Sequence, residues 1–164
     1  MRGSAMSEIG ESGRTGVRQF ISFKIGDEEY GVDIMDIREI KGWTATTELP
    51  DAPPYLRGVI NLRGAIIPVF DLRARFSGQL TEATPRHVTM VVTVGSRVMG
   101  LLVDAVADII TIPAQDIQPV PDIQSQDHER FLSGLVTVDG RMVALLDLDS
   151  MLQADLHAAA EAAA

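Results

Sequence analysis

One stretch of this sequence occurs twice, and the repeat constrains the fold more than any other feature. In the first copy, residues 58–72, two apolar and β-branched runs flank a short polar turn bounded by glycines, which is typical of an antiparallel β-hairpin. Residues 134–148 have the same glycines, apolar positions and closing Asp-Leu pair in the same register, without a gap. The sequence therefore predicts two copies of one small β unit.

The repeat continues upstream of both hairpins. Residues 19–25 alternate apolar and polar side chains, as a half-buried strand does, and a turn at 26–29 leads into a second strand. Residues 87–94 and 97–103 are expected to pair in the same way across a two-residue turn. The matched positions are Gly26 and Gly95, Gly31 and Gly100, Glu39 and Asp108, and Ile40 and Ile109.

Weaker signals predict the segments between the hairpins. Ile34, Ile37 and Ile40 are spaced by three, which fits a single helical turn as well as a continuing strand, and we favour a bent strand. Asp51 and the prolines after it predict a short helix at 51–56. The other predictions are a linker at 72–85, a proline-punctuated loop at 113–121, a counterpart of the short helix at 126–132, and a closing helix through Leu152 capped by Asp149 and Ser150.

The predicted fold class is all-β, with short helices and a C-terminal helix added. Five strands in each copy favour two small barrels, because closing a sheet hides the edges that otherwise invite aggregation. We expect a disordered leader at 1–16, one domain at 17–152 and an Ala-rich tail at 153–164. Two divisions of the domain are open: one subdomain at about 28–85 with a second formed by about 17–27 and 86–152, or the sequential halves 17–78 and 86–152.

Composition argues against several classes of function. The formal net charge of −9 disfavours a nucleic-acid partner and binding to an anionic membrane, since both depend on Lys and Arg. The chain has no cysteine, so it offers no disulfide and no thiolate nucleophile or metal ligand. No apolar run reaches the roughly 18 to 20 residues of a membrane helix, and the order of a secretory signal is not recognisable. A reducing, cytoplasmic location is compatible with these features.

Reactive groups are few. His87, His128 and His157 fall in different elements, and the sequence has no metal-ligand spacing and no phosphate-binding motif. Asp71 and Asp147 are equivalent in the repeat and, if an enclosed pocket joined them, could act as a catalytic acid–base pair. We favour local hydrogen bonds at the ends of their strands instead. A duplicated barrel without convergent reactive groups indicates binding, so we predict no catalytic residue, no metal and no other cofactor.

Two charged residues are candidates for binding a partner. Arg63 lies in the turn of the first hairpin, where the second copy has Asp139-Gly140, a favourable turn dipeptide, so the turn itself does not require arginine. An exposed guanidinium on a rigid hairpin can pair with a partner's carboxylate. Glu39 stands between apolar positions and is expected to border an apolar surface, where charges tune specificity.

Several of these segments closely resemble the CheW family of bacterial chemotaxis coupling proteins. The resemblance extends over roughly residues 17–152, and the Asn-Leu-Arg-Gly sequence of the first hairpin is typical of the family and its relatives. The segments that carry the resemblance are residues 26–34, 37–40, 57–64, 67–73 and 100–104.

The resemblance implies two SH3-like five-stranded barrels packed around a shared core. It also implies an adaptor without catalysis, which joins the cytoplasmic tip of a methyl-accepting chemoreceptor to the regulatory domain of the histidine kinase CheA at membrane receptor arrays. That kinase domain is itself similar to the family, so the two can alternate in rings, and ring contacts with the same protein or a paralogue are also allowed. The receptor tip would lay a helix in an apolar groove between the barrels.

Site residues are implied by the same resemblance. The receptor-binding positions are Ile37, Glu39, Gly58, Asn61, Arg63 and Ile109. The kinase-binding positions are Gln118, Pro119, Pro121, Asp122 and Ile123. Relatives often carry arginine in place of Gln118 and an aromatic residue in place of Ile123, so this face is expected to bind more weakly or to prefer another partner. A regulatory fragment of a kinase and a coupling protein fused to a receiver are related alternatives that would require further sequence.

Overall fold

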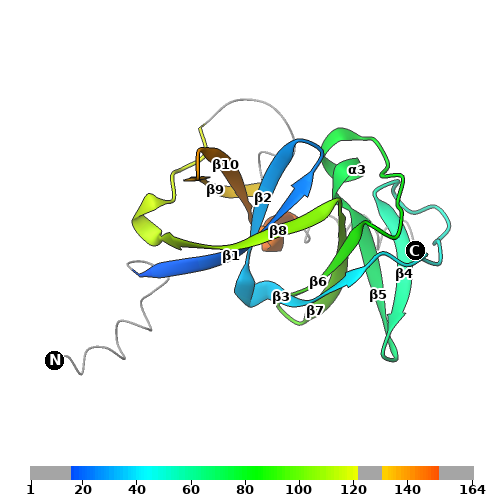
Figure 1. Cartoon of the computed structure of the whole chain (residues 1–164). Helices are drawn as coiled ribbons and strands as arrows, with labels where there is room; N and C mark the ends of the chain where they lie inside the picture. Colours follow the sequence, from blue (N-terminus) through cyan, green and yellow to red (C-terminus); the bar gives the residue numbers. More distant parts are fainter. Residues whose placement is uncertain (1–15, 122–130, 152–164) are drawn as a thin grey trace, which may run out of the picture.

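The computed structural model describes residues 16–121 and 131–151, and it contains two five-stranded β-sheets (Figure 1). The sheet named barrel A has the strand order β8-β1-β2-β10-β9, and the sheet named barrel B has the order β3-β6-β7-β5-β4. Barrel A consists of β8 (Ala105–Pro113), β1 (Val17–Ile25), β2 (Glu28–Asp33), β10 (Arg141–Leu146) and β9 (Leu132–Val138). Barrel B consists of β3 (Ile37–Gly42), β6 (Val88–Val94), β7 (Arg97–Val103), β5 (Ala65–Asp71) and β4 (Leu56–Leu62).

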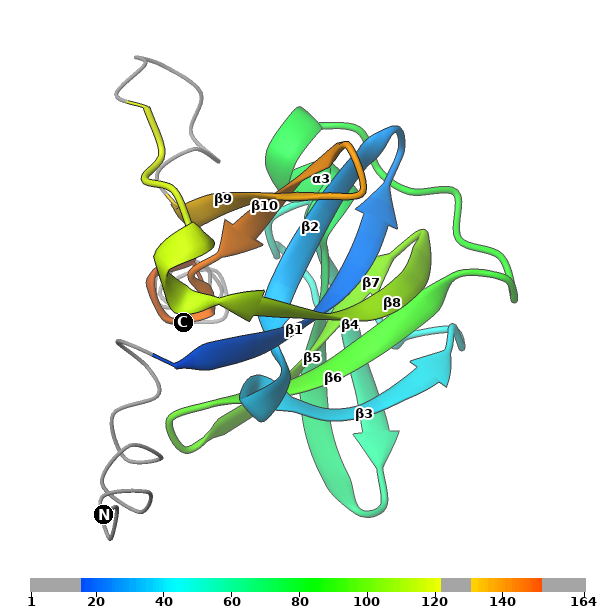
Figure 2. The same ribbon diagram turned by 60° about the vertical axis from the view of Figure 1, so that its left-hand side comes forward.

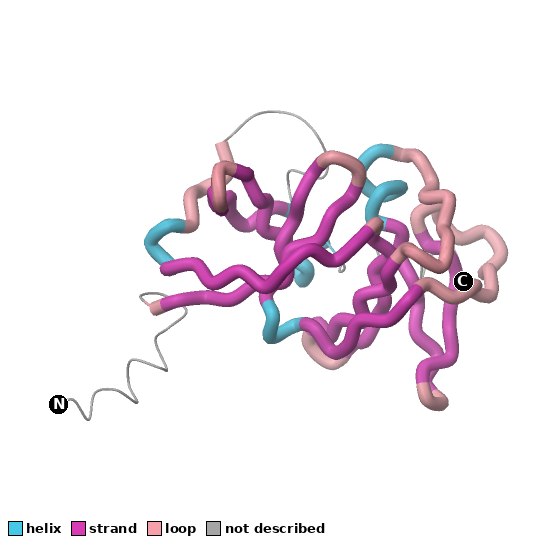
Figure 3. The backbone as a smooth tube through the Cα atoms, viewed as in Figure 1, coloured by secondary structure: helices cyan, strands magenta, loops and turns pink. Residues whose placement is uncertain are grey.

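The predicted all-β fold with two SH3-like subdomains is confirmed. The two sheets lie side by side in both ribbon views (Figures 1 and 2), and strands make up most of the described chain (Figure 3). The predicted hairpins form β1–β2, β4–β5, β6–β7 and β9–β10, each paired antiparallel.

Each barrel is built from both copies of the repeat. β2 of the first copy pairs in parallel with β10 of the second, with Gly31 opposite Leu145. The reciprocal pair joins β7 to β5, with Gly100 opposite Val69, which are the matching positions of the repeat. Barrel A therefore combines residues 17–33, 105–113 and 132–146. This exchange of strands crosses both divisions of the domain that the sequence suggested.

In each sheet, one isolated β-bridge connects the chain that follows one edge strand to the edge strand on the opposite side of the sheet. The chain after β3 returns to β4 through two backbone hydrogen bonds of 2.9 Å between Thr47 and Val59. Gln118, after β8, pairs in the same way with Leu135 of β9, at 2.8 and 2.9 Å. Both barrels are thus closed by equivalent bridges, which leaves fewer unpaired strand edges.

A glycine lies beside each bridge because the two chain segments pass too closely for a side chain. Gly58 has φ +136°, and a Cβ added there would lie 2.2 Å from the carbonyl oxygen of Thr47. At Gly134 an added Cβ would lie 2.6 Å from Ile117 Cγ2 and 3.2 Å from the carbonyl oxygen of Gln118. The repeated glycines of the hairpins therefore serve barrel closure.

One apolar core lies between the barrels and a smaller one lies within each. Burial of a large apolar side chain stabilises the fold by about 1.5–3 kcal/mol, so these clusters supply most of the favourable free energy of folding. The shared core includes the fully buried Phe23, Val32, Phe70, Leu72, Met90, Val92, Met99, Leu101 and Met151. The interior of barrel A contains Phe20, Ile110, Ile112, Val136, Val143 and Leu145, and that of barrel B contains Ile60, Leu62, Ile67, Val69, Val91 and Leu102.

The chain between β2 and β3 is not the bent strand that we favoured. Residues Ile34–Asp36 form a 3-10 turn, η1, before β3 begins. The side chain of Asp33 accepts a hydrogen bond of 2.9 Å from the backbone N–H of Met35, which stabilises the turn. The spacing of the isoleucines by three reflected this turn, and the chain crosses there from barrel A to barrel B.

Two further predictions are wrong, the short helix at 51–56 and the linker at 72–85. The segment at 51–56 is a turn, because Asp51 has φ +59° and so lacks the extended backbone of an N-cap. A helix instead occupies the predicted linker, as α3 (Leu72–Ser77). Asp71 caps it by accepting from Ala74 N at 3.2 Å, and Leu72 lies in the shared core.

The closing helix begins at Leu148, before the predicted caps Asp149 and Ser150, which lie within it. Asp147 accepts hydrogen bonds from the backbone N–H and the hydroxyl of Ser150, at 3.2 and 2.9 Å, so it is the capping residue. The helix is described as far as Met151, and the predicted leader up to residue 15, most of the segment at 126–132 and the tail lie outside the described residues. Gly16, which we expected in the leader, accepts a backbone hydrogen bond of 2.8 Å from Ala114. In the described residues no helix has the length and apolar character needed to cross a membrane.

Candidate functional site

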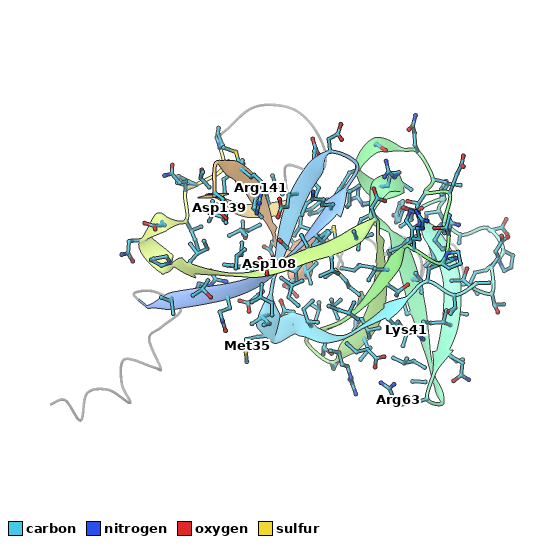
Figure 4. The ribbon with its side chains drawn as sticks, in the orientation of Figure 1. Met35, Lys41, Arg63, Asp108, Asp139 and Arg141 are labelled. Atoms are coloured by element: carbon cyan, nitrogen blue, oxygen red, sulfur yellow. The ribbon has the colours of Figure 1, made fainter. Side chains whose placement is uncertain are left out.

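The candidate site lies on barrel B, where β3 approaches the turn of the β4–β5 hairpin. Arg63 is the first residue of this two-residue turn and stands at the hairpin tip (Figure 4). It has φ +52°, a conformation that asparagine, aspartate and glycine adopt more readily than arginine. The turn therefore holds arginine despite its backbone preference, which indicates a use for the side chain.

Arg63 forms an ion pair with Glu39. Its Nη2 donates a hydrogen bond to Glu39 Oε1, and this hydrogen bond together with the charge of Arg63 lowers the pKa of Glu39. The Arg63 side chain is 67% exposed and that of Glu39 is 28% exposed. Because β3 and β4 are the two edge strands of barrel B, the pair spans the edges of one sheet. A partner at this surface would meet an ion pair whose remaining guanidinium donors face solvent.

Asn61 and Gly58, two of the other predicted receptor-binding positions, have roles inside the chain. Asn61 Oδ1 accepts a hydrogen bond of 2.8 Å from the backbone N–H of Gly64, which fixes the hairpin turn that carries Arg63. Gly58 permits closure of the barrel beside Thr47. Their assignment to receptor binding stays a prediction, and the structure gives each a reason to be present without a partner.

The apolar candidates differ in exposure. Ile37 is half-buried and packs against the shared core, whereas Ile109 is 53% exposed on β8 of barrel A. The structure therefore brings Glu39 and Arg63 into contact and places Ile109 on the other barrel. Ile40, the counterpart of Ile109 in the repeat, is 42% exposed on β3.

Sequence reasoning missed a second pair of exposed apolar residues. Ile66 on β5 is 63% exposed and Met142 on β10 is 61% exposed, and they occupy matching positions of the two hairpins. The repeat could have revealed this pair, because both copies have a hydrophobic residue just after the hairpin turn, where the end of the hairpin is exposed to solvent.

The predicted kinase-binding loop follows the closure of barrel A. Gln118 contributes its backbone to the bridge with Leu135, and Pro119 and Pro121 are exposed. The bridge fixes the start of the loop at the edge of β9. Asp122 and Ile123 lie outside the described residues, so the structure does not place them.

The carboxylates of the catalytic alternative are used within the chain. Asp71 is fully buried and accepts from the backbone N–H and hydroxyl of Thr81 at 2.8 and 2.7 Å, and from Arg57 Nη1 at 3.2 Å. Asp147 caps the closing helix next to barrel A. These contacts confirm the favoured interpretation, in which both aspartates form local hydrogen bonds at the ends of their strands.

A second polar network lies where the chain crosses back from barrel B to barrel A. Asp104 Oδ2 accepts from Gly26 N at 2.7 Å and from Arg73 Nη2, while His87 Nε2 lies 3.6 Å from Asp104 Oδ1. Burial alone would raise the pKa of Asp104, but the hydrogen bonds from Gly26 and Arg73 outweigh it and lower the pKa. His87 Nδ1 accepts from Thr84 N at 3.0 Å, so this histidine is occupied in local structure.

Within residues 16–121 and 131–151, no three histidine or carboxylate side chains gather closely enough to hold a metal ion. His128 and His157 are outside this part of the chain.

Comparison with known proteins identifies the family. The family model described as the CheW-like domain matches residues 19–156. The chain belongs to the CheW family. It is 50% identical over 145 residues to the chemotaxis protein CheW of Rhizobium meliloti (strain 1021), covering 88% of this chain and 94% of that protein. It is 35% identical to the chemotaxis protein CheW of Klebsiella aerogenes over 144 residues, which covers 88% of this chain and 87% of the relative.

The fold agrees with a solved CheW structure. The crystal structure of the scaffolding protein TtCheW from Thermoanaerobacter tengcongensis matches with a TM-score of 0.73 and 33% identity, covering 80% of this chain and 84% of that one. The chain is therefore a member of a family of chemotaxis scaffold and adaptor proteins, as the resemblance implied.

Proposed function

We propose that this CheW-family chain couples the cytoplasmic tips of methyl-accepting chemoreceptors to the histidine kinase CheA. It acts as a scaffold without catalysis, in the cytoplasm and at membrane receptor arrays. The observation that carries the proposal is the Glu39–Arg63 pair, which holds a guanidinium at a hairpin tip whose backbone does not favour arginine. Because the turn gains nothing from arginine, a partner is the best reason for it.

The receptor side of the proposal uses the surface of barrel B. A receptor helix would place apolar side chains against Ile37 and Ile40 and an acidic side chain near Arg63. Because Glu39 already orients the guanidinium, less conformational entropy is lost when a partner carboxylate pairs with it. Ile109 would extend the apolar contact onto barrel A.

The kinase side uses the loop that begins at Gln118. The bridge to Leu135 holds this loop at the edge of barrel A, so contacts there can form independently of Arg63. The receptor surface is thus centred on barrel B and the kinase surface lies on barrel A, and the shared core between the barrels relates the two partners in space.

Titration of the full chain into chemoreceptor signalling fragments, with and without the CheA regulatory domain, tests this proposal. We expect Arg63→Ala to weaken receptor binding about ten- to a hundredfold, the usual effect of losing a charge-assisted contact, while binding to the kinase domain alone is unchanged. Exchange of the two charges, as Glu39→Arg with Arg63→Glu, restores the ion pair and should not restore receptor binding.

Asp139→Ala is the matched control, since it alters the same turn position of the other hairpin. Receptor binding that survives Arg63→Ala, or that is lost equally in Asp139→Ala, would contradict the proposal. Failure of the unmodified chain to bind either partner would contradict it as well.

A further inference from the structure

One buried carboxylate in barrel A takes no part in the surfaces described above. The Glu29 side chain on β2 is only 7% exposed, and its Oε1 lies 3.1 Å from Arg141 Nε. Its Oε2 is buried and has no hydrogen-bond partner among the described residues. An unpaired buried carboxylate oxygen is costly, so its retention calls for an explanation other than stability.

Glu29 lines a pocket of about 450 Å³, which is large enough for a small ligand. Apolar side chains from β9 and β10 form one part of its wall, and charged side chains from the β1–β2 turn form another. The lining residues used in the argument below are Glu28, Glu29, Tyr30, Leu135, Arg141 and Met142. Glu28 Oε1 accepts a hydrogen bond of 2.5 Å from the hydroxyl of Tyr30, so the acidic wall is held in place.

The repeat shows that the fold does not need these charges. In barrel B the position of Glu29 is occupied by Val98 and that of Arg141 by Ala65. The matching strands pair in the same register, so an apolar pair is sufficient to build this part of a barrel. Replacing a buried ionic group by an apolar residue is often neutral or stabilising, which argues that the buried Glu29 is retained for binding.

We propose that this pocket binds a small organic cation of the alkylguanidinium type. The cation would donate to Glu29 Oε2, and its short apolar stem would lie against Leu135 and Met142. Arg141 is 49% exposed, so outward rotation of its side chain can admit the ligand. The site is separate from Glu39 and Arg63, and the inference does not rest on receptor coupling.

Agmatine, an aminobutyl guanidine, is the probe, and ¹H–¹⁵N NMR of the full chain is the readout. We expect saturable shifts at residues 28–30 and 141–144, and none with (4-aminobutyl)urea, which keeps the stem and the ammonium group of agmatine and lacks its guanidinium charge. Glu29→Gln should weaken agmatine binding about tenfold or more, because the charge-assisted hydrogen bond is lost. Asp116→Asn, which removes one negative charge from an exposed residue outside the pocket, should leave it unchanged.

Shifts without saturation, equal shifts with (4-aminobutyl)urea, or unchanged affinity in Glu29→Gln would each overturn the proposal. Should Glu29→Gln fail to fold, Met142→Ala decides, since this side chain is 61% exposed and its removal leaves the fold intact. That variant should weaken agmatine binding about threefold through loss of apolar contact, and undiminished binding would contradict the assigned pocket.

Discussion

The two hairpins of the repeat share a backbone and differ in chemistry. Both turns place two residues at positive φ, with Arg63 at 52° and Asp139 at 51°, each followed by a glycine. Figure 4 labels the cation Arg63 in the turn of β4–β5 and the anion Asp139 in the turn of β9–β10. Arg63 is paired with Glu39, whose counterpart in the repeat is Asp108. The comparison teaches that the fold determines the turn, while the side chain at its tip is free to serve a partner.

The apolar surface, by contrast, is duplicated. Ile66 and Met142 have nearly equal exposure at matching positions, and Ile40 and Ile109 form a second matching pair. Apolar contact could therefore be similar on both barrels, so charge is what allows a partner to distinguish barrel B from barrel A.

The largest difference between the hairpins should come from their bridge glycines. Gly58→Ala combines a positive φ with a clash against the backbone of Thr47, so we expect a loss of about 3–5 kcal/mol in the free energy of unfolding. Gly134→Ala meets the end of the Ile117 side chain, which can move, and should cost about 1–3 kcal/mol. Urea denaturation of both variants measures this, and equal losses would contradict the account of closure.

The aspartates that end the hairpins should differ next. Asp71 is fully buried and paired with Arg57, so Asp71→Ala leaves a cation and the groups of Thr81 without their partner, at about 3–5 kcal/mol. Asp147→Ala removes only a helix cap, at about 1 kcal/mol. Thermal unfolding of the two variants shows which one loses more stability. A larger loss for Asp147→Ala would contradict the claim that the burial of Asp71 and its contacts with Arg57 and Thr81 cause the difference.

The two crossings between the barrels should respond oppositely to pH. Asp36, in the first crossing, has a raised pKa because of burial and the charge of Asp33. Its ionisation therefore lowers the free energy of unfolding as the pH rises above 3.8, the ordinary pKa of an aspartate. Asp104, in the second crossing, has a lowered pKa, so its contribution is present above 3.8 and is lost as pH falls through the folded value.

At pH 7 we therefore expect Asp36→Asn to stabilise and Asp104→Asn to destabilise the fold. Both effects should vanish when urea denaturation is repeated at a pH below the folded pKa of Asp104, where both carboxyl groups are protonated in folded and unfolded chains. A gain that persists in acid for Asp36→Asn would mean that packing, not charge, is the cause.

The smallest expected effect concerns the turn residues themselves. Arg63→Asn places a residue that tolerates positive φ in the turn, so the midpoint of thermal unfolding should rise slightly although receptor binding is lost. Asp139→Arg should lower the midpoint slightly. Calorimetry of the pair against the unmodified chain measures the shifts, and a fall for Arg63→Asn would indicate that the ion pair with Glu39 outweighs the turn preference.

Much of the fold was predictable from short-range patterns. The hairpins follow from glycine turns and alternating side chains, and the repeat identified matching residues such as Gly58 and Gly134. The helix capped by Asp71 was missed because Leu72 to Ser77 is too short for a helical period to stand out. The turn at η1 was left ambiguous for the same reason.

The two charged residues of the candidate site were predicted from the sequence, but the contact between them was not. Arg63 and Glu39 were both recognised, but their pairing could not be predicted, because β3 and β4 approach each other only when the barrel closes. Glu29 was predicted in the turn at 26–29, and its burial became evident only from the neighbouring β10.

The sequence by itself determined the local units: antiparallel hairpins joined by tight turns, because backbone conformation and side-chain alternation act over a few residues. Only the tertiary structure decided how those units combine. The parallel pair β2–β10 joins residues about 115 positions apart, and the parallel pair β5–β7 joins residues about 30 apart. Their pairing depends on burying apolar faces of both copies in one shared core. That long-range burial, which no local pattern encodes, places Arg63 beside Glu39 and Glu29 beside Arg141.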